Sequence, residues 1–133
     1  MNQQTFVIIK PDAVEAGHVG AILSRYERAG LTIEEMELRT ITGEFADRHY
    51  SEHLERDFYP PLREFMISGP LVALILSGVD AIAKVREIHG ATDPSKADEG
   101  TIRAEFAESV RRNAVHASDS PESAVREIGL WFG

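Results

Sequence analysis

The apolar positions of the chain form two kinds of pattern, short runs rich in β-branched residues and longer stretches with helical spacing. Residues 5–10 form a run of the first kind that ends at a proline, which predicts a buried strand. Residues 71–76 are apolar throughout, a pattern typical of a central strand covered on both faces. Residues 31–41 predict another strand, and the apolar phase shifts between Ile33 and Met36, which indicates a bulge or twist.

Helical spacing marks most of the segments between these strands. Gly30 closes the first helix and Gly69-Pro70 follows the third, because glycine accepts the left-handed conformation that ends a helix and proline cannot continue one. Residues 91–100 are polar and predict a long surface loop, a kind of segment that is often functional. The predicted helices are residues 19–30, about 42–54, 62–67, a segment after Gly78 with Ala81, Ile82, Val85 and Ile88 inward, a segment from Thr101 with Ile102, Phe106 and Val110 as its apolar positions, and a segment after Ser120 with Ala124, Val125 and Ile128 inward.

The order of these elements predicts the fold class. About four strands occur in two similar βαβ halves, with no repeat of fixed period and no linker, so we expect residues 1–133 to form a single domain. The order favours an α+β fold, a ferredoxin-like α/β sandwich in which helices pack on one face of a four-stranded antiparallel sheet.

The fourth strand and the last helix meet in the octet Asn-Ala-Val-His-Ala-Ser-Asp-Ser, residues 113–120. Ala114 and Val115 predict the inner end of a strand, and the serines with the following proline are typical of a helix start. His116 is thus placed between a strand end and a helix N-terminus, with small neighbours that leave one face of the imidazole accessible. The alternative is a buried histidine with a structural hydrogen bond.

Composition narrows the possible functions. The chain is 43% hydrophobic and 27% charged, it has no cysteine, and its net charge is -8. These values indicate a globular protein without a disulfide, a thiol nucleophile or a thiolate metal site, and with little affinity for nucleic acid. The first residues lack the basic segment of a secretory signal peptide, and no segment approaches the ~20 apolar residues of a membrane span, so we expect a cytoplasmic protein that does not bind membranes.

An anionic ligand would have to be held by local basic side chains. The chain has neither of the glycine-rich sequences that cradle phosphates with backbone amides. Lys10, Arg86 and Arg103 stand at element ends or beside apolar stripes, which makes them candidates for phosphate binding, with an ordinary solvated role as the alternative.

Other candidate chemistry is less specific. His49 and His53 are four residues apart, but their sequence is not a zinc-protease motif and no third ligand is indicated, which favours a solvated helix face over a metal site. Ser118 lacks the context of an acyl nucleophile, and a supporting role is favoured. Glu127 could orient an imidazole. Phe58 lies in an aromatic turn, which favours an exposed stacking face.

At the octet the chain resembles the nucleoside diphosphate kinase family, whose active-site signature is similar to Asn-Ala-Val-His-x-Ser-Asp-Ser. Thr5 to Val14 resembles the family's first strand and its Lys-Pro-Asp turn. The resemblance extends over essentially all of the 133 residues. Further similar segments follow in family order: His49-Tyr50, Phe58-Tyr59-Pro60, Ser68-Gly69-Pro70, Thr92-Asp93-Pro94, Gly100-Thr101-Ile102-Arg103 and Ser120 to Trp131.

This resemblance implies an enzyme that transfers the γ-phosphate of a nucleoside triphosphate to a nucleoside diphosphate. The transfer would be ping-pong, through a phosphohistidine on His116, and would balance nucleotide pools. Glu127 and Ser118 would hold the other side of the imidazole and fix its tautomer. The nucleotide contacts implied in the same way are Lys10, Tyr50 and Asn113 for the transferred phosphate and the sugar hydroxyls, Arg86, Thr92 and Arg103 for the outer phosphates, and Phe58 and Val110 for the two sides of the base.

The resemblance also implies a cofactor and an assembly. Mg²⁺ would be carried by the nucleotide phosphates, with no protein side chain as a metal ligand. The ligands would be nucleoside di- and triphosphates, without a specific nucleic acid. The protein would be a homo-oligomer, a tetramer or hexamer built from dimers.

The chain departs from the family pattern at four positions. Ala13 and Ala117 stand where the family usually has glycine, Asp93 replaces a common asparagine, and Glu99 replaces a common proline. The methyl group of Ala117 lies beside His116 in the sequence and would tighten the pocket if that backbone required a positive φ.

Two alternatives to this enzyme remain open on the residues alone. A ferredoxin-like module that binds RNA should have aromatic residues on its central strands and a basic face, whereas residues 71–76 contain no aromatic residue and the chain is acidic. A phosphohistidine carrier that receives phosphate from a protein would not need Phe58 as a base platform or three separated basic residues.

Overall fold

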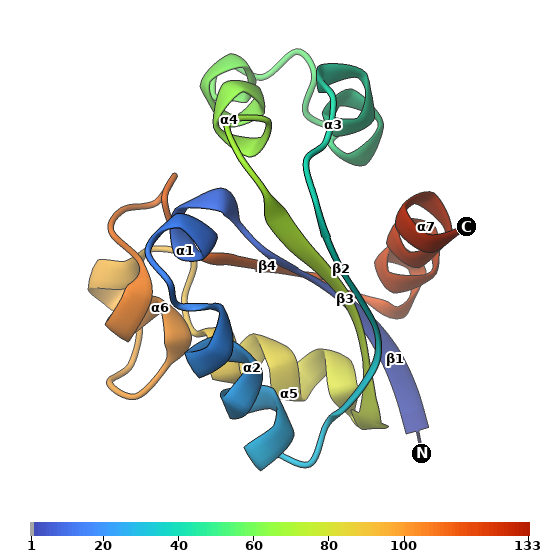
Figure 1. The fold of residues 1–133 in the computed structure, drawn as a ribbon, viewed down its shortest axis with the longest axis vertical. Helices are drawn as coiled ribbons and strands as arrows, with labels where there is room; N and C mark the ends of the chain where they lie inside the picture. Colours follow the sequence, from blue (N-terminus) through green and yellow to red (C-terminus); the bar gives the residue numbers. More distant parts are fainter. Residues whose placement is uncertain (1) are drawn as a thin grey trace.

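The structure is a computed structural model that describes residues 2–133 (Figure 1). Its strands are β1 (Asn2–Ile9), β2 (Thr32–Arg39), β3 (Leu71–Val79) and β4 (Val115–Ala117). Its helices are α1 (Pro11–Glu15), α2 (Val19–Arg28), α3 (Gly43–His49), α4 (Tyr59–Met66), α5 (Ala81–His89), α6 (Ile102–Phe106) and α7 (Pro121–Phe132), with a 3₁₀ turn, η1 (Pro94–Lys96), between α5 and α6. None of the described helices is long and apolar enough to cross a membrane.

The four strands form one antiparallel sheet in the order β2-β3-β1-β4, which confirms the predicted ferredoxin-like α+β class. The two central strands are the most apolar, and β3 is buried from Leu71 to Ser77, as the continuous apolar run predicted. The pairing of β2 with β3 shifts register between Ile33 and Glu35, so the predicted bulge is confirmed.

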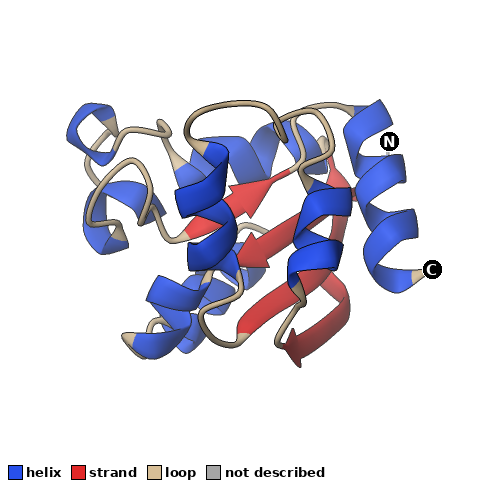
Figure 2. Ribbon diagram, turned by 90° about the horizontal axis from the view of Figure 1, so that it is seen from above, coloured by secondary structure: helices blue, strands red, loops and turns tan. Residues whose placement is uncertain are grey.

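The helices pack on both faces of the sheet, so the expectation that they cover one face is wrong (Figure 2). Along β1, Val7 and Ile9 face a core built with α1, α2, α5 and α6, whereas Phe6 and Ile8 face a second core built with α3, α4 and α7. Alternate residues of a strand point to opposite faces, so an unbroken apolar strand requires two covering layers.

Three predicted helices have different boundaries in the structure. The helix expected to reach Leu54 ends at His49, and the one expected to include Val110 ends at Phe106. The helix α4 begins at Tyr59 rather than Leu62, because two prolines within the first turn of a helix are tolerated where the amides have no intrahelical partner.

The inward face of α7 also differs from the prediction. Val125 is 75% exposed, whereas Glu127 is 7% exposed and Trp131 is 4% exposed. The buried stripe therefore runs through Ala124, Glu127 and Trp131. The spacing of apolar residues does not predict this stripe, because the buried carboxylate of Glu127 stands in its middle.

A buried polar pair joins α2 to α5. The hydroxyl of Tyr26 lies 2.6 Å from Nε2 of His89, and the two side chains are 0% and 1% exposed. Burial and the nearby Arg103 hold the pKa of His89 well below its ordinary value of 6.5. The histidine is therefore neutral in the folded protein at neutral pH.

This pair predicts a loss of stability in acid. Below about pH 6.5 the unfolded chain takes up a proton on His89 and the folded chain does not, so the free energy of unfolding falls as the pH falls. We expect the double substitution Tyr26→Phe with His89→Leu to make this decline shallower in denaturant titrations between pH 7 and pH 5. Tyr26→Phe alone keeps His89 and should keep the steep decline. Equal slopes for all three proteins would contradict the prediction.

Candidate functional site

A cavity of about 530 Å³ opens where β4, the end of β1 and the loop after α5 meet α3 and α7. Eight of the residues predicted from the sequence line it, namely Lys10, Tyr50, Arg86, Thr92, Arg103, Asn113, His116 and Glu127. The fold thus gathers side chains that are spread over more than 110 positions of the sequence. A concave site with several convergent charged groups is the usual form of a small-ligand site.

The strand β4 places His116 on one face of the sheet. His116 pairs with Ile8 of β1, and residues directly opposite one another on adjacent strands point to the same face. Ile8 belongs to the core that contains Trp131, so the imidazole lies on that side. Its ring centroid is 6.2 Å from that of Phe6.

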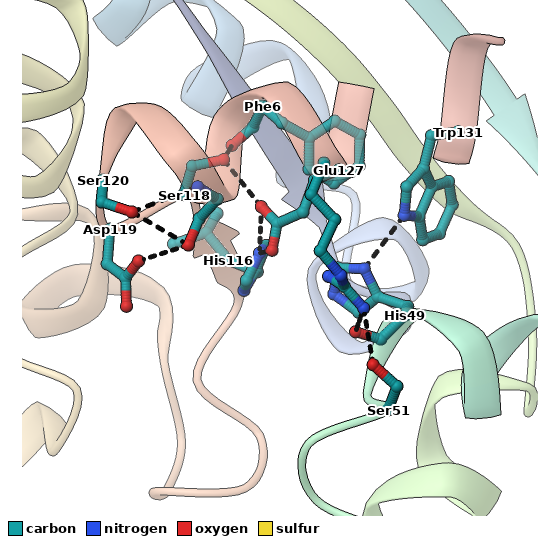
Figure 3. A network of polar contacts seen from close by, with 12 residues as sticks. Phe6, His49, Ser51, His116, Ser118, Asp119, Ser120, Glu127 and Trp131 are labelled. Atoms are coloured by element: carbon teal, nitrogen blue, oxygen red, sulfur yellow. Dashed lines mark hydrogen bonds and ion pairs between the residues drawn. The ribbon is translucent and has the colours of Figure 1, made fainter. Parts of the chain in front are cut away.

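The carboxylate of Glu127 holds the imidazole of His116 (Figure 3). Both carboxylate oxygens lie 3.2 Å from Nε2, and the hydroxyl of Ser118 donates to Oε1 at 2.6 Å. A carboxylate accepts hydrogen bonds, so Nε2 carries the proton and Nδ1 keeps its lone pair. Nδ1 makes no hydrogen bond with the described part of the chain and is therefore available to a ligand.

A second histidine lies against the first and was assigned to a solvated face from the sequence, which is wrong. His49 is 5% exposed, and its ring meets that of His116 edge to face with centroids 5.0 Å apart. The indole N–H of Trp131 donates to Nδ1 of His49 at 3.0 Å, which fixes the tautomer with the proton on Nε2. Burial is the main cause that holds the pKa of His49 well below 6.5, and repulsion from the neighbouring basic groups adds to it, so this ring is neutral.

These histidines raise the question of a protein-bound metal. Potential ligand atoms of His49, His116 and Glu127 all lie within 4.8 Å of one another. The geometry nevertheless disfavours a cation, because Trp131 takes one nitrogen of His49 and leaves a proton on the other, and Glu127 already takes Nε2 of His116. His53, which the spacing made a possible partner ligand but which the sequence analysis did not favour, is not part of this cluster.

Lys10 and Asn113 are bonded to one another in the lining of the cavity. Nζ of Lys10 donates to Oδ1 of Asn113 at 2.9 Å, and the two residues are 7% and 3% exposed. Burial, followed by repulsion from Arg103, lowers the pKa of Lys10 to about 8. The ammonium group is thus poorly solvated, and it would gain from an anionic partner.

The two predicted arginines differ in their bonding. Arg103 donates to three backbone carbonyl groups, those of Gly90 at 2.9 Å, Val115 at 2.8 Å and Asn113 at 3.4 Å. It therefore ties the end of α5 to the strand that carries His116. Arg86 has no hydrogen bond or ion pair with the described residues and is exposed at the cavity, so its guanidinium group is available to a ligand.

A further arginine was missed by the sequence analysis. Arg126 of α7 donates to the carbonyl groups of Arg48 and His49 and to the hydroxyl of Ser51, at 2.7 to 3.0 Å. A cation at the C-terminal carbonyl groups of a helix is favourable, and here it holds the end of α3 against α7. No local pattern identifies such a contact, because its partners are 75 or more positions away.

Phe58 and Val110 lie outside the lining of the cavity, and both are exposed. Phe58 is 49% exposed, as the turn suggested, and Val110 is 58% exposed. The guanidinium group of Arg112 lies 5.4 Å from the ring centroid of Phe65, so the loop that carries Val110 reaches α4, which begins next to Phe58.

Comparison with known proteins decides the family. The sequence profile described as "Nucleoside diphosphate kinase" matches residues 3–133. The chain belongs to the nucleoside diphosphate kinase family. Its relatives include nucleoside diphosphate kinases of a Nocardioides species, 61% identical over 132 residues that cover 99% of this chain and 98% of the relative, and of Rhodococcus erythropolis, 58% identical over 133 residues that cover 99% and 96%.

The fold agrees with this assignment. A crystal structure of the Aquifex aeolicus nucleoside diphosphate kinase superposes with a TM-score of 0.97 at 46% identity, covering 100% of this chain and 96% of that one. The chain is therefore an enzyme, and membership of the nucleoside diphosphate kinase family implies phosphotransfer between a nucleoside triphosphate and a nucleoside diphosphate.

The departures from the usual nucleoside diphosphate kinase pattern are accommodated in the structure. Ala117 lies in β4 and does not have a positive φ, so its methyl group causes no backbone strain. Ala13 is buried within α1. Asp93 accepts hydrogen bonds from the amide and the hydroxyl of Ser95, and so begins the 3₁₀ turn. Glu99 is exposed in the loop before α6.

The depressed pKa of Lys10 predicts how nucleotide affinity depends on pH. The charged form binds phosphate, and above about pH 8 the free protein must take up a proton to form it. We expect the dissociation constant for a nucleoside diphosphate to rise by up to about tenfold for each pH unit above 8, measured by calorimetry. In Lys10→Arg the charge persists and this rise should be absent. A flat profile for the unmodified protein would contradict the prediction.

Proposed function

We propose that the enzyme transfers phosphate in two half-reactions through a phosphohistidine on His116. The observation that supports this most strongly is the bond between Nε2 and Glu127, because it leaves the Nδ1 lone pair as the free nucleophile in a cavity lined by cations. A neutral imidazole is a competent nucleophile near neutral pH.

In the first half-reaction Nδ1 attacks the γ-phosphorus of a nucleoside triphosphate. An N–P bond forms as the bond to the β,γ-bridging oxygen breaks, and the electron pair leaves on the nucleoside diphosphate. The imidazole then carries a positive charge, which the carboxylate of Glu127 stabilises. In the second half-reaction a terminal oxygen of another nucleoside diphosphate attacks the same phosphorus, and the N–P electron pair returns to Nδ1.

The cations stabilise the charge that moves during both steps. Lys10, Asn113 and Tyr50 line the cavity, and Nζ of Lys10 donates to Oδ1 of Asn113; we propose that all three donate to the transferred phosphate and the sugar hydroxyls. Arg86, Thr92 and Arg103 also line the cavity and are proposed to bind the outer phosphates. Phosphoryl transfer depends mainly on positioning and on charge neutralisation of this kind.

The site fits a Mg²⁺ ion that is carried by the nucleotide phosphates rather than held by protein side chains. Of the carboxylates that line the cavity, Glu127 is engaged by His116 and Ser118, and Asp119 by the hydroxyl of Ser123, whereas Glu52 is exposed to solvent. When bound, the ion would supply positive charge that offsets the charge of the phosphates. Lys10 and Arg86 would then orient the phosphates from the protein side.

The base would be held by stacking between Phe58 and Val110 rather than by its hydrogen-bonding edges. Stacking on an aromatic face tolerates every base, since each has a π surface. We therefore propose broad base tolerance, which suits a role in balancing the pools of nucleoside triphosphates.

If His116 becomes phosphorylated, the protein should take up label from γ-labelled ATP. Incubation with γ-labelled ATP and Mg²⁺ should give an acid-labile label that passes to added GDP. His116→Ala should carry no label, whereas His18→Ala, a substitution outside the cavity, should label fully. Label that persists in His116→Ala, or that does not pass to GDP, would overturn the proposal.

Removal of the Glu127 carboxylate should change the rate of His116 phosphorylation but not the affinity for nucleotide. Glu127→Ala leaves the imidazole without its partner, and we expect phosphorylation of His116 to slow by about tenfold to a hundredfold, since hydrogen bonds to charged groups are worth about 1.5–3 kcal/mol. Nucleotide affinity should change by less than about twofold because Glu127 faces the histidine. Glu122→Ala, at an exposed position of the same helix, is the matched control. An unchanged rate in Glu127→Ala would exclude the carboxylate from the mechanism.

A further inference from the structure

The backbone just before the catalytic strand has an unfavourable conformation. Ala114 has a φ of 74°, and it is one of two non-glycine residues in the described chain with positive φ. The amide of Val115 donates to the carbonyl group of Asn113 at 2.9 Å, which closes a three-residue γ-turn around Ala114. A γ-turn with positive central φ is rare and strained, and an alanine gains none of the freedom that glycine has there.

Such strain persists only where neighbouring groups hold it in place. The amide of Ala114 donates to Oδ2 of Asp12 at 3.1 Å, and its carbonyl group accepts a hydrogen bond from the amide of Lys10 at 2.8 Å. Both polar groups of the strained residue are thus bonded to the junction between β1 and α1. Asp12 is 6% exposed, and its Oδ1 has no hydrogen-bond partner among residues 2–133.

We propose that Asp12 is a positioning residue for His116, which acts through the turn at Ala114. The turn ends where β4 begins, and β4 pairs Val115 with Ile9 and His116 with Ile8. A relaxed turn would shift the start of this three-residue strand and move Nδ1 away from the cations. This inference rests on the proposed role of His116 as the nucleophile.

The competing explanation is electrostatic. The charge of Asp12 also raises the pKa of Lys10, against the larger effect of burial. A variant without Asp12 could therefore lose activity because Lys10 loses its proton, with the turn unchanged. The two explanations differ in what restores activity, because strain can be removed independently of charge.

The test is a cycle of Asp12→Ala and Ala114→Gly, with Asp12→Asn as the conservative variant. Glycine adopts a positive φ readily, so Ala114→Gly makes the turn favourable without the carboxylate. Ala97→Gly is the matched control, since Ala97 stands in a loop at a φ of -76° where glycine relieves no strain. The measured quantities are the single-turnover rate of His116 phosphorylation, the dissociation constant for ADP and the melting temperature.

We expect Asp12→Ala to slow phosphorylation by about tenfold to a hundredfold, the effect of losing one charge-assisted hydrogen bond. Asp12→Asn keeps an acceptor oxygen and should restore most of the rate. Ala114→Gly in the Asp12→Ala background should also restore it, whereas Ala97→Gly should not. Ala114→Gly alone should raise the melting temperature by about 2 °C or more, because it removes strain from the folded state.

Three results would overturn the inference. These are an unchanged rate in Asp12→Ala, a rate that stays low in the double variant, or an Asp12→Asn variant as slow as Asp12→Ala, which would assign the effect to charge. If Asp12→Ala does not fold, recovery of folding by Ala114→Gly tests the same contact. The melting temperatures report on the turn without any chemistry, so they distinguish failure of this inference from failure of His116 as the nucleophile.

Discussion

The carboxylate of Glu127 is the group on which the rest of the site depends. It lies inside the protein, where an unpaired charge would be costly, and its two partners are the ring nitrogen of His116 and the hydroxyl of Ser118. These bonds determine which nitrogen of His116 carries the proton and which keeps its lone pair. They also explain why the inner stripe of α7 contains an acidic residue, at the cost of an apolar position in the core.

The positive charge of the site is local and does not reflect the composition of the chain. The protein carries a net charge of -8, yet four basic residues converge at the cavity. Screening weakens the effect of remote acids over ~8 Å at physiological salt, whereas a cation in contact with phosphate is little affected. Burial reinforces this effect, because a poorly solvated ammonium such as that of Lys10 loses little water when it binds an anion.

The sequence predicted the strands, the fold class and eight of the residues that line the cavity, because a resemblance over the whole chain supplied positions that local patterns did not. It could not predict contacts made by the tertiary structure. His49 is buried and neutral because Trp131, which is far away in the sequence, donates to it in the core. Val125 is exposed because Glu127 occupies the buried side of the same helix. The strain next to His116 falls on Ala114 rather than Ala117, since it is the turn, and not the strand, that reverses the chain.

Because helices cover both faces of the sheet, the residues of the site are held by two different cores. The imidazole and its partners lie with the core formed by α3, α4 and α7, whereas Arg86 and Arg103 belong to α5 and α6, which cover the opposite face. The central strands β1 and β3 contribute side chains to both cores, and the edge strand β4 carries His116. Under the proposed mechanism, a sequence change in one core alters the surroundings of His116 while the other core keeps Arg86 and Arg103 in place. Histidine reactivity and phosphate binding can then change separately among related enzymes.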